Sequence, residues 1–264
     1  MMNIEFEMVA ILKELKEKYY VSGLKAEFEA EGSRLAELWH LKELVAKSDL
    51  NLTIKIGGAE AIRDFYDARE LRASCIVAPM IETPFAMKKY LSAIKKVYAE
   101  TEKRNITAFY ANIETIDAYQ NIDRILEVEG VNSLRGIVLG RSDMSYSLGM
   151  TKNDVNSSKM LAIAKDLAVK VFEAGFEFVV GGNISTDSLT FLEELPANML
   201  TAFETRKVIF RCPMPLKHKA AKEGINKAIE FELIWLRYKK EYYSQISTED
   251  DERIKSLENR MLCS

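Results

Sequence analysis

Residues 75–115 contain a complete strand–helix–strand unit, and this unit sets the pattern for the whole chain. The segment reads CIVAPMIETPFAMKKYLSAIKKVYAETEKRNITAFYANIET. An apolar, β-branched run is followed by Thr83 and Pro84, a common helix start, then by a helical pattern and a second apolar run. Strands separated by a helix usually pair in parallel, so the segment predicts a βαβ unit with its helix outside a sheet.

The same alternation runs along most of the chain. Strands are predicted at residues 24–28, 52–56, 75–81, 106–113, 134–139, 176–180 and 199–203. Helices are predicted at 33–47, 59–71, 84–103, 115–127, 157–174 and 186–194, with a long one at 217–243. An open doubly wound sheet and a closed barrel both satisfy this pattern. The Gly-x-Gly-x-x-Gly motif that favours the open form is absent, so we predict a (β/α)8 TIM barrel.

Two parts of this barrel are less directly specified. An eighth strand must come from residues 206–210 or from the N-terminal region, where the apolar spacing indicates an amphipathic helix. The chain has 264 residues, which suits a barrel of about 250 residues. We therefore predict a single barrel domain over residues 1–264, with 217–264 as a helical and possibly exchanged C-terminal extension.

Composition narrows the classes of partner. The formal net charge is -3, so no global positive field attracts nucleic acid or a membrane surface. The three cysteines, Cys75, Cys212 and Cys263, form no Cys-x-x-Cys pair, which fits a cytoplasmic location. The two histidines, His40 and His218, are too few for a three-His zinc site. Acid–base chemistry must therefore use carboxylates, lysine, tyrosine or a metal-bound water.

Acidic side chains follow neighbouring strands of the predicted barrel. Glu82 and Glu114 end the related segments PMIET and ANIET, and Asp143 follows the next strand. Adjacent strands lie about 4.8 Å apart, so Glu114 and Asp143 are predicted to form an oxygen-ligand site for Mg²⁺ or Mn²⁺. Glu82 is a candidate for binding substrate, but it is equally well explained as an acid that meets the positive end of a helix dipole.

Residues 140–156 show no clear secondary structure, and a long loop at this end of a barrel is usually functional. Backbone N–H groups after Gly140, at Arg141 and Ser142, are candidates for binding a substrate carboxylate. Arg206 follows the last predicted strand and is a candidate for an anionic substrate tail, although a solvated charge cluster explains it equally well.

These segments resemble a known family. ANIET at 111–115 and GRSDMSYSLG at 140–149 are similar to the paired I-E-T and G-P-x-D-L-S-x-S-L-G motifs of the HpcH/HpaI aldolase and citrate lyase β-chain family. VAPMIET at 77–83 resembles that family's V-P-M-V-E-S strand, and the similarity covers residues 25–149, about half of the chain.

The resemblance implies a metal-dependent carbon–carbon lyase on a (β/α)8 barrel whose subunits exchange their last helix, and hence a homo-oligomer. By position, Glu114 and Asp143 would hold the divalent cation, which chelates a 2-keto acid or an acyl-CoA-derived enolate partner. The cation would polarise the ketone and stabilise the enolate.

Two segments depart from the family pattern. Lys55 lies in IKIGG at 54–58, where the family usually has an arginine, so the charge is kept and the planar fork is lost. The family's D-x-E-H segment, whose histidine is the base, reads EFEAEG at 27–32. Either Glu29, Glu31 or a metal-bound hydroxide takes the proton, or the reaction is not a pyruvate aldol cleavage. The alternative function is a barrel that binds a small anionic ligand with altered activity or without turnover.

Overall fold

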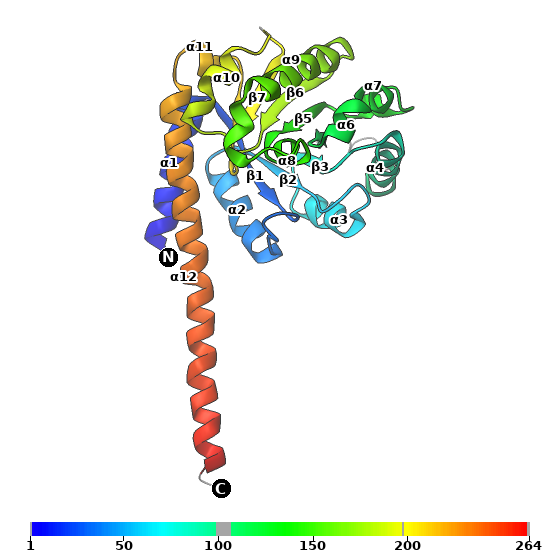
Figure 1. Cartoon of the computed structure of the whole chain (residues 1–264). Coiled ribbons are helices and arrows are strands. Elements are labelled where there is room, and N and C mark those ends of the chain that lie inside the picture. The colour runs from blue at the N-terminus through cyan, green and yellow to red at the C-terminus, as the bar shows by residue number, and fades with distance from the viewer. Residues whose placement is uncertain (1, 99–106, 197, 263–264) are drawn as a thin grey trace.

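The computed structural model describes residues 2–98, 107–196 and 198–262, and in these residues eight strands close into a barrel with helices around it (Figure 1). The strands are β1 (Val21–Glu27), β2 (Asn51–Lys55), β3 (Cys75–Ala78), β4 (Ala108–Ile113), β5 (Gly136–Gly140), β6 (Glu177–Gly181), β7 (Leu200–Glu204) and β8 (Val208–Arg211). They follow one another around the barrel in chain order, which confirms the predicted fold class.

The helices of the described residues alternate with the strands. They are α1 (Met2–Tyr19), α2 (Leu35–Lys47), α3 (Ile62–Glu70), α4 (Pro84–Val97), α6 (Ile116–Gln120), α7 (Ile122–Leu126), α8 (Arg141–Ser147), α9 (Ser158–Glu173), α10 (Leu189–Glu193), α11 (Met214–Lys217) and α12 (Ala221–Leu262), with short 3₁₀ turns at Val131–Ser133, Lys152–Asn156 and Thr186–Ser188. Residues 99–103 of the predicted helix 84–103, residue 106 of the predicted strand 106–113, and Cys263 lie outside the described residues. Within the described ranges, no helix is both long and apolar enough to span a bilayer.

The eighth strand comes from the first of the two predicted sources, but its direction differs from that of a regular (β/α)8 barrel. β8 pairs antiparallel with both β7 and β1, while the pairs from β1 to β7 are parallel. Only residues 205–207 join β7 to β8, whereas a parallel crossover needs about a dozen residues. The last two strands therefore form a hairpin, whose turn lies at the C-terminal end of β7.

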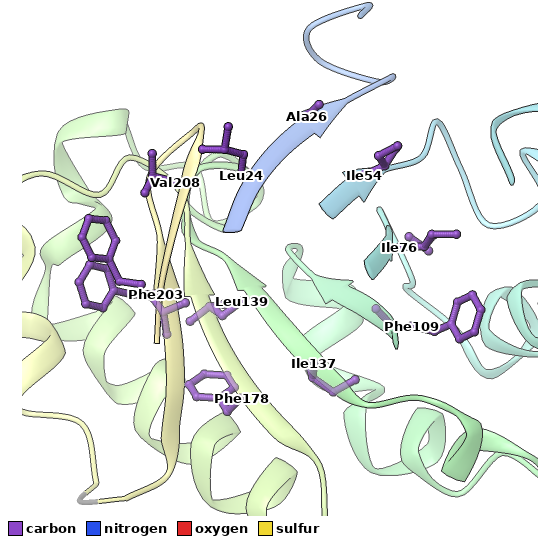
Figure 2. Packing of buried hydrophobic residues seen from close by; sticks show 14 of the residues in the cluster. Leu24, Ala26, Ile54, Ile76, Phe109, Ile137, Leu139, Phe178, Phe203 and Val208 are labelled. Atoms are coloured by element: carbon purple, nitrogen blue, oxygen red, sulfur yellow. The ribbon is translucent and has the colours of Figure 1, made fainter. Parts of the chain in front are cut away.

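The barrel separates bulky apolar side chains from small and polar ones. Residues such as Ile76, Phe109 and Phe178 belong to the main core between the strands and the helices (Figure 2). Alternate residues on the same strands face the barrel interior, because successive strand side chains point to opposite faces. Inside, a separate small cluster contains Val77, Val138, Val179 and Ala202. The interior is therefore available for polar groups and cavities.

Residues 140–156 correct the prediction of an irregular loop. Gly140 leads directly into α8, and a 3₁₀ turn follows at Lys152–Asn156. The segment is rich in serine, aspartate and asparagine, which have modest helix propensity, so its helix depends on tertiary contacts that local sequence does not show. α12 likewise extends past the predicted end at residue 243 as one continuous helix to Leu262, and its last part projects away from the barrel (Figure 1).

Candidate active site

A cavity of about 560 Å³ lies at the C-terminal ends of the parallel strands, and we call it the rim cavity. It brings together seven of the residues selected from the sequence, namely Glu29, Lys55, Glu114, Gly140, Ser142, Asp143 and Arg206. These residues follow or end β1, β2, β4, β5 and β7, or belong to α8. The end of the barrel at which parallel strands terminate is where barrel enzymes place their active sites.

Glu114 is the most deeply buried acid in this cavity, with 1% of its surface exposed. Its Oε1 accepts a hydrogen bond from the Met80 backbone N–H at 2.9 Å, and its Oε2 accepts one from Asn112 Nδ2 at 2.8 Å. Burial raises the pKa of Glu114 and the nearby Asp143 adds to this, although Lys55 and both hydrogen bonds oppose it. Glu114 thus lies in a site that favours a neighbouring positive charge.

Gly140 gives Glu114 its position. A Cβ atom at residue 140 would lie 2.6 Å from Glu114 Oε2 and 2.7 Å from Glu114 Cβ, closer than real contacts allow. The absence of a side chain at the end of β5 therefore lets the carboxylate of the neighbouring strand occupy this space.

Lys55 provides the positive charge beside Glu114. Its Nζ lies 3.3 Å from Glu114 Oε2 and 2.8 Å from Glu29 Oε2, so it contacts both carboxylates. Burial disfavours the charged form, but Glu114, Glu29 and Glu27 together raise the pKa of Lys55. Lys55 is therefore an ammonium ion at neutral pH, and it can stabilise negative charge but not accept a proton.

The donor set of the rim cavity fits a hard divalent cation. Asp143 is half-buried and lines the same cavity as Glu114. Its negative charge helps to raise the pKa of Glu114. Asn112 Oδ1 is buried and accepts no hydrogen bond from the residues that the structure describes. No group of three or more His, Cys, Asp or Glu side chains suited to a metal occurs in residues 2–98, 107–196 and 198–262. Mg²⁺ is commonly bound by one or two carboxylates, with waters and substrate completing its shell, so two acids and an amide oxygen suffice.

Two of the predicted acids have other roles. Glu31 pairs with Lys207 and lies 4.0 Å from Arg206, in the turn between β7 and β8, so it does not share the position of Glu29 beside Lys55. Glu82 accepts a hydrogen bond from Thr115 Oγ1 at 2.8 Å. Its carboxylate therefore contacts the N-cap residue of α6, and a substrate contact of Glu82 stays a prediction.

The backbone N–H of Arg141 stays a predicted substrate contact, while its side chain binds other parts of the rim. Its guanidinium is fully buried and donates to acceptors in the β6–α10 loop and the 3₁₀ turn after α8. Those acceptors are Gly181 O at 3.0 Å, Gly182 O at 2.9 Å, Val155 O at 3.2 Å, Asn156 Oδ1 at 2.7 Å and Ser188 Oγ at 3.3 Å. With these partners the side chain has no geometry for a substrate contact, and it holds the rim loops together.

Sequence reasoning missed the buried ionic pair next to this site. Lys25 points into the barrel, where its Nζ contacts Glu204 Oε1 and lies 3.2 Å from Glu27 Oε1. The period-two alternation of LKAEF at 24–28 puts Lys25 and Glu27 on the face opposite Leu24 and Ala26, which is the signal that could have found them. Asn112, two residues before Glu114, was detectable by the same rule.

Comparisons with known proteins agree with this geometry. The family model described as HpcH/HpaI aldolase/citrate lyase matches residues 44–179, just over half of the chain. None of the curated proteins matches. Among solved structures, citrate synthase SbnG has a TM-score of 0.59 and 16% identity, over 81% of this chain and 86% of that one.

Two further structures have the same fold. An HpcH/HpaI aldolase from Desulfitobacterium hafniense DCB-2 has a TM-score of 0.59 and 15% identity, over 84% of this chain and 87% of that one. An HpcH/HpaI aldolase/citrate lyase family protein from Burkholderia cenocepacia J2315 has a TM-score of 0.57 and 12% identity, over 83% of this chain and 98% of that one.

Proposed function

Because the chain belongs to the HpcH/HpaI aldolase/citrate lyase family, we propose that it is a carbon–carbon lyase that acts on a 2-keto acid through an enolate. The observation that carries this proposal is the ammonium group of Lys55, held between Glu29 and Glu114 in the rim cavity. A fixed positive charge in a buried site stabilises an oxyanion that develops during reaction.

Different residues of the rim cavity have different roles in the proposed aldol cleavage. Arg206, whose side chain is 54% exposed, and Ser142 line the cavity and bind the substrate carboxylate. Lys55 donates a hydrogen bond to the keto oxygen. Glu29, whose side chain is 28% exposed, takes the proton of the substrate hydroxyl group. The carbon–carbon bond then breaks, the hydroxyl carbon leaves as an aldehyde, and the bond's electron pair becomes the enolate of the 2-keto acid. The enolate carbon then takes the proton that Glu29 holds.

A divalent cation, Mg²⁺ or Mn²⁺, is part of this proposal. Glu114 and Asp143 would hold it, with Asn112 Oδ1 as a further oxygen donor, and when bound it would act as a Lewis acid on the keto group. Lys55 and Glu29 would keep the same roles as hydrogen-bond donor and base.

Deuterium exchange tests the reaction. Full-length protein incubated with Mg²⁺ and pyruvate in D₂O should exchange the methyl protons of pyruvate, as followed by proton NMR. The K55M and E29Q variants should reduce exchange by about 100-fold or more, the usual scale for an oxyanion donor or general base. If the unmodified chain exchanges no proton with several 2-keto acids, the alternative, a barrel that binds a small anion without turnover, replaces the proposal.

Mn²⁺ titration followed by electron paramagnetic resonance tests the metal separately. The D143A variant should weaken Mn²⁺ binding by about tenfold, while D117A, which removes an exposed acid from the first turn of α6, should not change it. Equal affinity of the D143A variant and the unmodified chain would remove the metal from the proposal.

The remaining expectations concern the assembly and its location. We propose a homo-oligomer in the cytoplasm, since the family resemblance implies exchange of the last helix and the cysteine pattern fits a reducing compartment. Light scattering on the purified chain should give a mass of at least twice 30.1 kDa.

A further inference from the structure

A second cavity of about 750 Å³ occupies the opposite half of the barrel interior, and we call it the lower cavity. Its lining includes residues at the N-terminal ends of the strands, such as Gly23, Asn51, Cys75 and Ala108. The volume falls within the range of about 300–1,000 Å³ that is usual for small-molecule sites. It lies on the side of the barrel away from the proposed reaction.

The lower cavity exists because the strands carry small residues where barrels are normally filled. Layers of bulky branched side chains usually pack the interior of a (β/α)8 barrel. Here the wall contains the small residues Thr53, Cys75 and Ala202 beside larger ones. At Gly136, a Cβ atom would lie 2.4 Å from the Glu177 carbonyl oxygen, so this position cannot carry a side chain without a shift of the backbone.

The lower cavity has an apolar patch inside the barrel and charged groups among its lining residues. Val77, Val138, Val179 and Ala202 form the apolar cluster inside the barrel and line the cavity. At the opening, Glu177 accepts hydrogen bonds from Arg135, Arg211 and Tyr110. A ligand that matches this wall therefore has an apolar body and a polar end.

The opening carries an excess of positive charge. Arg135 Nε lies 2.9 Å from Glu177 Oε1, and Arg211 binds both oxygens of the same carboxylate at 3.1 Å. The other acid among the described lining residues is Glu204, which pairs with Lys25 deep in the barrel. Two guanidinium groups therefore share one carboxylate. Their side chains are 63% and 51% exposed, so both can also contact an anion from solvent.

The lower cavity is separated from the rim cavity. Val138 and Glu204 line both cavities, and Glu204 is paired with Lys25, which lines only the rim cavity among the described residues. A molecule in the lower cavity would not contact Lys55 or Glu114, which line only the rim cavity among the described residues. Its binding is therefore independent of the proposed reaction.

We propose that the lower cavity is a binding site for a small amphiphilic monoanion, such as a medium-chain carboxylate. The apolar chain would contact Val77, Val179 and Ala202, and the carboxylate would lie at the opening near Arg135 and Arg211. This site goes beyond the proposed lyase function, which uses the other end of the barrel.

Isothermal titration of the full chain with decanoate tests this site. Saturable binding with one site per chain is expected, and decanol, which lacks the charge, should bind about tenfold more weakly. R135Q should weaken decanoate binding by about tenfold, because it removes one guanidinium and leaves the Arg211–Glu177 pair in place. R63Q is the matched control, because Arg63 is 86% exposed on α3 and should leave binding unchanged.

Cavity-filling variants test the location. A202L should abolish decanoate binding, and V77I, which adds one methylene group and is less disruptive to folding, should weaken it. The far-ultraviolet circular dichroism of each variant shows whether the barrel is intact. The proposal would be overturned if the unmodified chain showed no saturable binding of decanoate. It would also be overturned if the folded V77I and A202L variants bound decanoate as tightly as the unmodified chain does.

A competition experiment with oxalate distinguishes decanoate binding in the lower cavity from binding in the rim cavity. An excess of oxalate, a small dianion suited to the rim cavity, should not displace decanoate. Displacement would place decanoate in the rim cavity and overturn the second site. Failure of the deuterium exchange experiment would leave the decanoate result unaffected, because that experiment probes the rim cavity.

Discussion

At the scale of single residues, the absence of a side chain at Gly140 is as important for the position of Glu114 as its charged and polar partners are. Glu114 occupies space that a methyl group at residue 140 would fill, at 2.6 Å from its Oε2. The carboxylate is held on one oxygen by the Met80 N–H and on the other by Asn112 and Lys55. A small change at Gly140 therefore displaces the group on which the rim cavity is centred.

We expect G140A to lower activity by about tenfold or more, because moving a catalytic group by even 1 Å has large effects on rate. G58A is the control, because a Cβ there meets no atom within 4 Å. Both variants are compared by deuterium exchange and by thermal melting. Equal exchange rates for G140A and G58A would show that the position of Glu114 is not critical.

Glu177 makes stability depend on pH in a defined direction. Burial acts to raise its pKa, but Arg211, Tyr110 and Arg135 together lower the pKa below the ordinary glutamate value. A carboxyl group with a lower pKa in the folded state stabilises the fold above its unfolded pKa, and this contribution is lost as pH falls through the folded pKa. Between about pH 6 and about pH 3, the unmodified chain should therefore lose more unfolding free energy than E177Q does.

Urea unfolding at several pH values measures this difference. E173Q, which changes an exposed glutamate near the end of α9, should follow the unmodified chain. If E177Q loses as much stability on acidification as the unmodified chain does, the Arg211–Glu177–Arg135 cluster does not account for the acid sensitivity.

The candidate site was predictable in part. Glu114 and Asp143 share one cavity because they follow neighbouring strands, which the spacing of the two motifs indicates. The role of the Arg141 side chain was not predictable, because partners such as Gly181 and Ser188 lie 40 or more residues later in the chain and no local pattern shows them. Long-range hydrogen bonds of a buried guanidinium are visible only in the folded chain.

At the scale of elements, two related helix starts lie side by side around the barrel. Thr83 Oγ1 accepts a hydrogen bond from the Ala86 N–H at 3.1 Å, and Thr115 Oγ1 accepts one from the Ala118 N–H at 3.2 Å. Thr115 also donates to Glu82, so the second cap links two successive βα units. The caps were evident from the sequence because they depend on residues within one turn.

T83A should lower the unfolding free energy by about 1 kcal/mol through loss of one cap. T115A should cost more, because it also leaves the Glu82 carboxylate without its hydroxyl partner. Chemical denaturation compares the two variants, with T83S and T115S as controls that keep the hydroxyl group. A smaller loss for T115A than for T83A would contradict the linking role of Thr115.

At the scale of the whole molecule, α12 has two different parts. Its first half packs on the barrel through residues such as Ile225, Phe231 and Trp235. Tyr243 donates a hydrogen bond to Glu37 of α2 at 2.6 Å, and the residues after it are exposed. The second half therefore contributes little to the stability of the isolated chain.

A chain that ends at Ser244 should unfold within about 0.5 kcal/mol of the full chain, since surface changes have effects of this size. A chain that ends at Glu230 loses Phe231, Trp235 and the contacts with α2, so it should be strongly destabilised. Thermal melting of monomer fractions at low protein concentration compares the three chains. A large loss on removing residues 245–264 would show that this segment stabilises the isolated chain.

The closed barrel was predictable because strand and helix patterns alternate over residues 23–203 and the Gly-x-Gly-x-x-Gly motif that favours an open sheet is absent. The sequence of β8 itself does not indicate its direction, since a strand of four residues carries no such signal. The distance between β7 and β8 does carry that signal, because three residues cannot cross the sheet.

The pairing of β8 with β1 has a consequence for how this protein is made. One of the two neighbours of β1, β8, leaves the ribosome about 180 residues after it. At the slow rate of translation, β1 keeps an uncovered edge until β8 is synthesised. Nascent chains stalled before residue 208 would therefore expose strand edges that attract one another, and the cell's chaperones would be expected to bind them during that interval.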